Sequence, residues 1–260
     1  MNTLVFDIET VPDVALGRRL HSLGDLPDAE VAKAMFTLRR QQTGDEFLPH
    51  AQHRIVAISC ALRSREGLKL WSLGEEGAPE EELIERFFDG LERYTPVLVS
   101  WNGGGFDLPV LNYRALRAGV SAARYWEIGD QDTAFRYNNY LSRYHWRHID
   151  LMDVLSGMQA RARASLADTA ALLGLPGKLG FSGAKVWDAW LAGEIGQIRR
   201  YCETDVLNTY LIFLRFELMR GHLTRERYGE ELERVRALLR DGREPHYAEF
   251  LRAWDAGAPS

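Results

Sequence analysis

The sequence predicts an α/β fold, because apolar strand-like runs and amphipathic helices alternate early in the chain and helices dominate its second half. A buried-strand pattern at 4–6 is followed by a predicted hairpin of 55–62 and 68–73, and then by a further apolar run at 97–101. The 260 residues are 46% hydrophobic and 27% charged, as in an ordinary globular protein. These proportions exclude a disordered chain, a collagen-like repeat and a small disulfide scaffold.

Helical periodicity is clearest over 80–94, where apolar residues recur at every third or fourth position until Pro96 ends the pattern. An earlier helix is expected near 29–42, inside a mixed and polar excursion that covers 11–53. Beyond residue 150 the pattern predicts helices at 151–158, 165–173, 184–191, 195–220 and 225–239.

No linker rich in Pro, Gly or Ser divides the chain, so we expect one domain over 1–223 and a helical extension over 224–260. Lys plus Arg number 32 and Asp plus Glu 37, which gives a net charge of −5. Nucleic acid would therefore be bound only at a local basic surface or through metal ions held by acids. Cys60 and Cys202 lack metal-binding spacing, and no apolar run could span a bilayer. We expect a cytoplasmic protein with no membrane partner.

Three acids follow or end predicted strands. Asp7 and Glu9 are two residues apart on a strand, so their carboxylates point to the same face and repel each other. A divalent cation would relieve this repulsion, and all-oxygen ligands favour Mg²⁺ or Mn²⁺. Alternatively, Glu9 points to solvent where the strand ends, which the pair alone favours. Asp107 follows the glycines at 103–105 and is the third candidate, with the N-cap of a helix as its equal alternative.

Tyr201 and Asp205 lie one turn apart within a strongly helical segment, so they share a helix face. Much of this helix is apolar, and a carboxylate buried there needs a partner, for which a metal ion is suited. The alternative is a core tyrosine beside a solvated acid. Asp150 and Asp153 begin a predicted helix, where the macrodipole favours acids, and we expect structural roles for both.

These segments resemble, in the same order, the three motifs of the DEDD 3′–5′ exonucleases. The position where the histidine subclass has its His is Arg200, so the chain resembles the tyrosine subclass. The residues around each motif are most similar to the proofreading exonuclease domain of family B DNA polymerases. The chain also resembles a group of stand-alone bacterial proteins that are predicted to be exonucleases of this kind. The motifs are F-D-I-E-T at 6–10, N-G-G-G-F-D-L-P-V-L at 102–111 and Y-x-x-x-D at 201–205, within a resemblance that covers about 4–221.

The resemblance implies a ribonuclease H-like fold, with a mixed five-stranded sheet flanked by helices and a helical C-terminal half. It implies a 3′–5′ exonuclease that releases nucleoside 5′-monophosphates with two divalent cations, Mg²⁺ or Mn²⁺. Tyr201 would orient the attacking water and help to take its proton. The metal ligands implied are Asp7, Glu9, Asp107 and Asp205.

Substrate contacts are expected from two sources. The motifs of the family imply Thr10, Asn102 and Phe106. The segment 135–148 interleaves aromatic and basic residues, as a single-strand channel would, and adds the candidates Arg143 and Tyr144. Alternatively, the aromatic residues of that segment fill the core. Lys178 either contacts a phosphate or is an ordinary solvated lysine.

Single-stranded DNA 3′ ends are the favoured substrate, and RNA 3′ ends are the alternative, because the sequence does not show how the site meets a 2′-hydroxyl. Another class is a nucleic-acid-binding module of the same fold without activity, which the presence of every motif residue disfavours. A further hypothesis is docking on a polymerase or repair protein through the charged helical surface of 222–260.

Overall fold

The computed structural model describes residues 2–257 and contains a five-stranded sheet with the order β3-β2-β1-β4-β5. The central strand β1 is antiparallel to β2 and parallel to β4; β2 pairs antiparallel with β3, and β4 pairs parallel with β5. The sheet is therefore mixed, and the predicted α/β, ribonuclease H-like fold is confirmed. The strands are β1 Thr3–Pro12, β2 His53–Ser64, β3 Gly67–Ser72, β4 Val97–Ser100 and β5 His148–Asp150.

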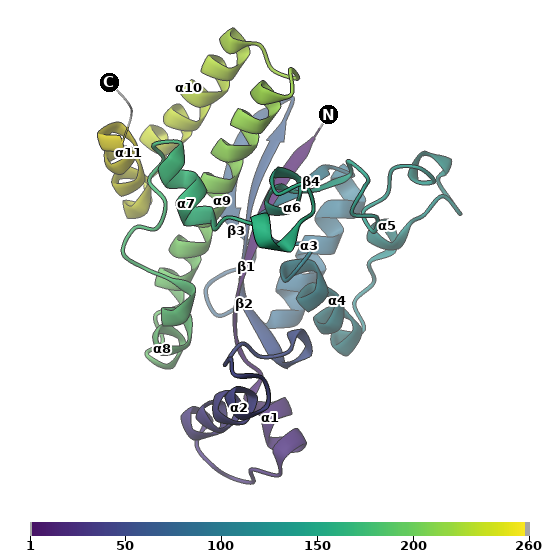
Figure 1. The fold of residues 1–260 in the computed structure, drawn as a ribbon, viewed down its shortest axis with the longest axis vertical. Coiled ribbons are helices and arrows are strands. Elements are labelled where there is room, and N and C mark those ends of the chain that lie inside the picture. The colour runs from purple at the N-terminus through teal and green to yellow at the C-terminus, as the bar shows by residue number, and fades with distance from the viewer. Residues whose placement is uncertain (1, 258–260) are drawn as a thin grey trace.

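Helices cover both faces of this sheet (Figure 1). On one side lie α3, α4 and α5, and on the other lie α7 to α11. The pair α1 and α2 forms a separate lobe beyond one end of β1. The helices are α1 Val14–His21, α2 Asp28–Thr43, α3 Glu80–Tyr94, α4 Asp107–Ala118, α5 Ala123–Trp126, α6 Leu151–Leu155, α7 Leu166–Leu172, α8 Val186–Leu191, α9 Ile195–Met219, α10 Arg225–Asp241 and α11 Pro245–Gly257.

Strand β1 divides the core by the alternation of its side chains. Phe6 and Ile8 pack into the core beneath α3 and α4, whereas Val5 packs on the opposite face beneath α9. Asp7 and Glu9 therefore face α9. The strand does not end at Glu9 but continues through a bulge to Pro12, so Glu9 is only 7% exposed. The alternative that Glu9 points into solvent at a strand end is wrong, because the longer strand keeps it beneath a helix.

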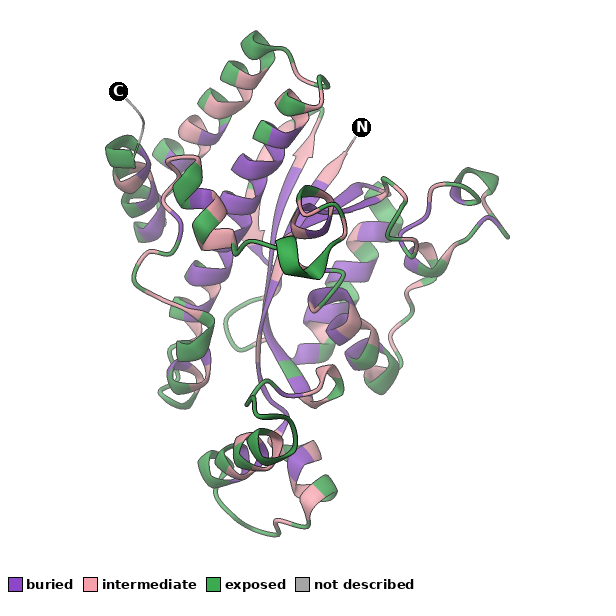
Figure 2. Cartoon of the chain, in the orientation of Figure 1, coloured by how far each residue is buried: buried purple, intermediate pink, exposed green. Residues whose placement is uncertain are grey.

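Helix α9 is buried along most of its length (Figure 2). One side packs against β1 and β2, and the C-terminal helices α10 and α11 cover other parts of it. Val235, Phe250 and Trp254 are buried in the same core as the apolar residues of α9. The expected helical extension at 224–260 therefore packs over α9. This holds for residues 224–257, because the last three residues lie outside the described part.

Arg114 of α4 is buried at 3% exposure and ties three elements together. Its guanidinium donates to Asp13, at the end of β1, and to both carboxylate oxygens of Glu80, the first residue of α3. Glu80 also accepts from the backbone N–H of Ile55 in β2, at 2.7 Å. Burial raises the pKa of Asp13, but the bond from the backbone N–H of Leu16 and then the Arg114 guanidinium outweigh it and hold that pKa below its usual value. Helix α4, which begins at Asp107, is thereby fixed against the sheet.

We expect Arg114→Ala to lower the free energy of unfolding by about 3–5 kcal/mol, because it leaves two buried carboxylates without their cation. Urea unfolding at neutral pH measures the change. Arg117→Ala, on the same helix but half exposed, is the matched control and should cost about 1 kcal/mol or less. Equal losses in the two variants would show that the buried network carries no special stability.

Candidate active site

Four carboxylates from three separate elements meet at the face of β1 beneath α9. Asp7 and Glu9 come from β1, Asp107 begins α4, and Asp205 lies in the buried part of α9. The backbone N–H of Ile8 donates to Asp107 Oδ1 at 3.1 Å, which joins the start of α4 directly to the strand. Asp107 is the first helical residue and not the N-cap, which is Phe106, so the capping alternative is wrong.

The pKa values show how strongly these carboxylates interact. Burial and the charges of Asp107, Glu9 and Asp205 raise the pKa of Asp7 well above its usual range. Burial and the charges of Asp205 and Asp107 do the same to the pKa of Glu9. Burial raises the pKa of Asp107 to about 7 and that of Asp205 to about 6. The four acids therefore cannot all ionise cheaply without a positive charge among them.

The residues present fit a divalent cation site. Asp205 Oδ1 is buried and has no hydrogen-bond partner among the described residues. The only cation that lowers the pKa of Glu9 or Asp205 is Lys178, whose side chain is exposed. Four carboxylates and one peripheral ammonium leave a local excess of negative charge. Oxygen donors of this kind are those that Mg²⁺ and Mn²⁺ prefer.

Cys202 lies against the cluster, a contact that the sequence analysis missed. Its thiol contacts the backbone oxygen of Asp7 at 3.3 Å and Asp7 Oδ2 at 3.5 Å. Ligand atoms of Asp7, Glu9 and Cys202 lie within 4.8 Å of one another. Burial and the negative charge of Asp7 raise the pKa of Cys202 well above its usual value, so the thiol is a donor to the carboxylate. Cys202 lies between Tyr201 and Asp205 on one helix, and this position could have predicted its contact with the cluster.

Tyr201 is 7% exposed, and its hydroxyl lies near the carboxylate of Asp205, one turn further along α9, where it lowers the pKa of that carboxyl. Its ring packs against Phe181, with the ring centroids 5.0 Å apart. Burial and the charges of Asp205 and Glu9 raise the pKa of the phenol, so the group stays protonated at neutral pH. Tyr201 and Asp205 therefore face the cluster together, as their spacing predicts. The alternative of a core tyrosine beside a solvated acid is wrong, because Asp205 is buried.

The loop that leads from β4 to Asp107 is held by Asp150. Its two carboxylate oxygens accept from the backbone N–H groups of Asn102 and Gly104, each at 2.9 Å. Asn102 has a φ of +64°, and a Cβ on Gly103 would lie 2.3 Å from Ser100 Oγ, so this turn requires glycine. Asp150 is also the N-cap of α6, which confirms its structural role. That it also orders the loop before Asp107 was not predicted.

A cleft of about 650 Å³ adjoins the acids and is lined by Glu9, Thr10 and Phe106. Thr10 Oγ1 is hydrogen-bonded to His53 Nδ1 at 2.9 Å, and the Phe106 ring packs edge-on against the His53 ring. The structure thus brings two expected substrate residues together with a metal-ligand candidate. Asn102 lies apart from the cleft lining, in the turn described above.

Arg143 and Tyr144 lie in the segment between β4 and β5, and neither lines the cleft. Arg143 forms an ion pair with Asp153 at 3.0 Å, and Tyr144 is exposed. In the same segment Phe135 and Tyr140 are buried in the core beneath α3 and α4. The core-filling alternative is therefore correct for those two rings, and a nucleic-acid contact of Arg143 and Tyr144 stays a prediction.

Asn208 links α9 to the loop that carries Lys178. Its side chain is fully buried; Oδ1 accepts from Gly177 N at 3.1 Å, and Nδ2 donates to Gly177 O at 3.0 Å. Lys178 follows directly and is close enough to lower the pKa of Glu9 and Asp205. The Lys178 side chain is exposed, and its contact with a phosphate stays a prediction. A buried amide three residues after Asp205 is the sequence signal that was missed.

Comparison with known proteins decides the family. A family model described as a predicted 3′–5′ exonuclease related to the exonuclease domain of PolB matches residues 45–254. The chain belongs to this family. It is accordingly an exonuclease of the 3′–5′ class, as the resemblance implied. The match includes Asp107, Tyr201 and Asp205, whereas Asp7 and Glu9 precede it and join the cluster through the structure of β1.

Among solved structures, the chain is similar to the family B DNA polymerase from the hyperthermophilic archaeon Pyrobaculum calidifontis. The identity is 19%, the TM-score is 0.49, and the match covers 84% of this chain and 24% of the polymerase chain. This chain therefore spans about a quarter of that polymerase's length. No curated protein matches it. No helix within residues 2–257 has the length and apolar character that crossing a membrane requires.

Without divalent cations, the protein should lose stability as the pH rises from about 4 to about 7. The pKa of Asp107 is raised from 3.8 to about 7 in the folded state, so the folded protein binds more protons than the unfolded chain in this window. This contribution to stability is present below pH 4 and is lost as the pH passes 7. Thermal unfolding in EDTA measures it, and saturating Mn²⁺ should weaken the dependence. A stability that rises across this window would contradict the repulsion described above.

We expect Asp7→Asn to raise the free energy of unfolding in EDTA at pH 8 by about 1–3 kcal/mol, because it removes one negative charge from a crowded carboxylate cluster. The same variant should lose most of the stabilisation that Mn²⁺ gives the natural protein. Asp89→Asn, at an exposed position of α3, is the matched control and should change neither quantity. An Asp7→Asn protein that is less stable than the natural protein in EDTA would contradict the repulsion among these carboxylates.

Proposed function

We propose that the protein is a metal-dependent exonuclease that removes nucleoside 5′-monophosphates from the 3′ ends of single-stranded DNA. The observation that carries this proposal is the cluster of four carboxylates with raised pKa values, three of them buried and Asp7 partly buried, in which one Asp205 oxygen has no partner among the described residues. Such a cluster has no evident structural purpose, because it destabilises the chain that builds it. Membership of a 3′–5′ exonuclease family supplies the reaction class.

The metal ligands in this proposal are Asp7, Glu9, Asp107 and Asp205, which would hold two divalent cations, Mg²⁺ or Mn²⁺. Bound there, the cations would lower the pKa of water and neutralise the developing charge on the phosphate and the leaving 3′ oxygen. Their positive charge would also let an acidic protein bind a polyanion.

The other residues of the site position the reactants. The Tyr201 hydroxyl, fixed by Asp205 and the Phe181 ring, would orient the attacking water and take part in its proton transfer. Lys178, held by the Asn208–Gly177 pair, would contact a phosphate oxygen. The cleft of Glu9, Thr10 and Phe106 would receive the terminal nucleotide, with Phe106 against its base.

The first experiment follows 5′-labelled single-stranded DNA and RNA of equal sequence on a gel, in the presence of Mg²⁺, Mn²⁺ or EDTA. We expect a metal-dependent ladder that shortens from the 3′ end and is faster for DNA, with 5′-monophosphates as products. Asp7→Ala should abolish it while the protein stays folded. Faster cleavage of RNA would replace the proposed substrate, and binding without cleavage of either strand would favour a non-catalytic module.

Tyr201→Phe should lower the cleavage rate by about 10²- to 10⁴-fold, the range for a positioned proton-transfer group. The phenyl ring keeps its packing on Phe181, so folding should be normal. Single-turnover rates with saturating Mg²⁺ measure the loss. Tyr228→Phe, on the C-terminal helix α10, is the matched control and should cleave normally. An unchanged rate for Tyr201→Phe would remove the hydroxyl from the mechanism.

A further inference from the structure

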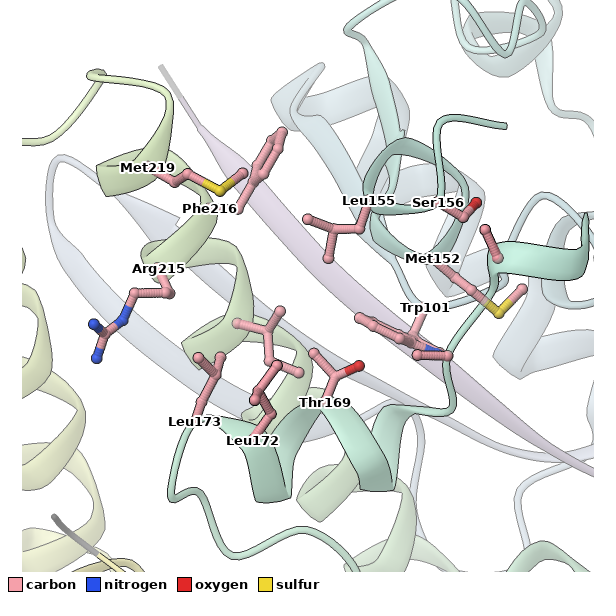
Figure 3. Close-up of a pocket in the computed structure, with 13 residues that line it drawn as sticks. Trp101, Met152, Leu155, Ser156, Thr169, Leu172, Leu173, Arg215, Phe216 and Met219 are labelled. Atoms are coloured by element: carbon pink, nitrogen blue, oxygen red, sulfur yellow. The ribbon is translucent and has the colours of Figure 1, made fainter. Parts of the chain in front are cut away.

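A second hollow, of about 310 Å³, lies between the end of β4 and the C-terminal part of α9 (Figure 3). Trp101 and Met152 lie together at one end, and Phe216 and Met219 lie toward the other. Leu155 of α6 and Leu172 of α7 flank it. The lining is apolar except for Ser156, Thr169 and Arg215. We call it the Trp101 groove.

The Trp101 groove opens on the side of the sheet that carries the acids. Val5 of β1 pairs with Val99 of β4, and Trp101 directly follows β4, which ends at Ser100. Trp101 packs against the core that contains Val5 and Val99, which places its side chain on the α9 side, as for Asp7. The groove and the metal-ligand candidates therefore lie on the same face of the sheet.

Helix α9 also connects the acids with the Trp101 groove. Ile212 and Phe216 follow Asp205 at about two and three turns, and so they lie near the same face of the helix. Both line the Trp101 groove. The hollow thus extends along α9 from the acids toward the C-terminal end of the helix, as a continuation of the site.

The rim of the groove is basic, although the whole chain has a net charge of −5. Arg215 lines it, and Arg161 flanks the lining residue Ala162. Neither arginine forms an ion pair with another described residue. Arg163 follows the lining residue Ala162 and is paired with Asp153, and Arg220 follows Met219 and is paired with Glu217. Arg215 stacks over the Tyr228 ring at 4.9 Å, but no carboxylate among the described residues neutralises Arg161 or Arg215, and such positive charge suits a polyanion.

Several apolar groups around the groove are exposed to solvent. Leu155 is 43%, Leu172 is 82% and Met219 is 67% exposed. A contiguous apolar patch with a polar rim usually marks a binding site. Flat apolar surfaces beside free arginines are what single-stranded nucleic acid requires, because bases pack on the former and phosphates on the latter.

We propose that the Trp101 groove binds the base of the penultimate nucleotide, on the 5′ side of the scissile phosphate. This inference rests on the proposed exonuclease function. The terminal nucleotide occupies the cleft of Glu9, Thr10 and Phe106, the scissile phosphate lies at Asp7, and the next base enters between Trp101 and Leu155. The site then grips two nucleotides, one on each side of the bond that breaks.

The test compares two double variants of the full chain. Leu155→Asn with Leu172→Asn alters the groove without adding charge. Leu20→Asn with Leu116→Asn is the matched control, because those leucines are 53% and 80% exposed on helices that do not line the groove. The substrates are a DNA strand, the same strand with an abasic penultimate position, and the p-nitrophenyl ester of thymidine 5′-monophosphate, which has no penultimate nucleotide.

We expect the groove variant to raise KM for the intact strand by about 5- to 100-fold, the worth of one packed base. The abasic substitution should cost the natural protein a similar factor and should add little in the groove variant. Hydrolysis of the thymidine ester should be equal in all three proteins, and the control variant should behave as the natural protein.

The proposal is overturned if the natural protein cleaves intact and abasic strands equally well, or if the abasic penalty persists undiminished in the groove variant. The groove would then be left for an apolar segment of a protein partner. Failure of the natural protein to cleave both the ester and the strands would instead overturn the exonuclease function on which the groove proposal rests. If the natural protein hydrolyses the ester but cleaves intact and abasic strands equally well, the exonuclease function stands and only the groove proposal fails.

Discussion

Burial and electrostatic repulsion within a cluster of four carboxylates form the constraint around which this fold is organised. The charges of Asp107, Glu9 and Asp205 raise the pKa of Asp7, and those of Asp205 and Asp107 raise the pKa of Glu9. Among the described residues, Lys178 is the cation that opposes such shifts in Glu9 and Asp205. A chain that builds such a cluster must hold it together from outside. The long strand β1, the bond from Ile8 to Asp107 and the all-round burial of α9 provide that support. Stability is given up at the centre and recovered in the surrounding packing.

The supporting polar groups act on the elements that carry the acids. Arg114 fixes α4 against β1 and α3, and Asp150 orders the loop from which α4 starts. Asn208 holds the loop of Lys178, and Cys202 donates to Asp7. Each is buried or partly buried, and each has its own partners within the chain. The carboxylates are thereby oriented before any cation or substrate arrives.

Local patterns were sufficient for most of the fold, whereas the set of four acids was predicted from the resemblance to the exonuclease motifs. The helix at 80–94 and the spacing of Tyr201 and Asp205 follow from periodicity, which is a property of neighbouring residues. The length of β1 was underestimated, because Thr10 to Pro12 extend the strand through a bulge that only pairing with β2 reveals. Contacts over long sequence separations, such as Arg114 with Asp13, leave no periodic signal.

The candidate site shows the same division. The carboxylates were predicted because they stand in the motifs of a known family, whereas Cys202, Asn208 and the loop-ordering role of Asp150 were not, because a cysteine, an asparagine or a capping aspartate is ordinary in sequence. The aromatic run at 135–148 shows the opposite error. Its composition suits a nucleic-acid channel, yet Phe135 and Tyr140 fill the core. Composition alone cannot tell a ring that stacks on bases from one that packs beneath a helix.

The order in which the acids occur along the chain has a consequence for synthesis. Asp7 is translated well before Asp205, yet the two lie in one cluster. A nascent chain on the ribosome therefore has β1 and α4 before α9 can close over them. Until then the strand face that carries Asp7 and Glu9 has no cover from α9, and the cluster lacks its fourth carboxylate. The candidate site is thus completed by one of the later helices to be made, and its acids are brought together only when that helix packs on the sheet.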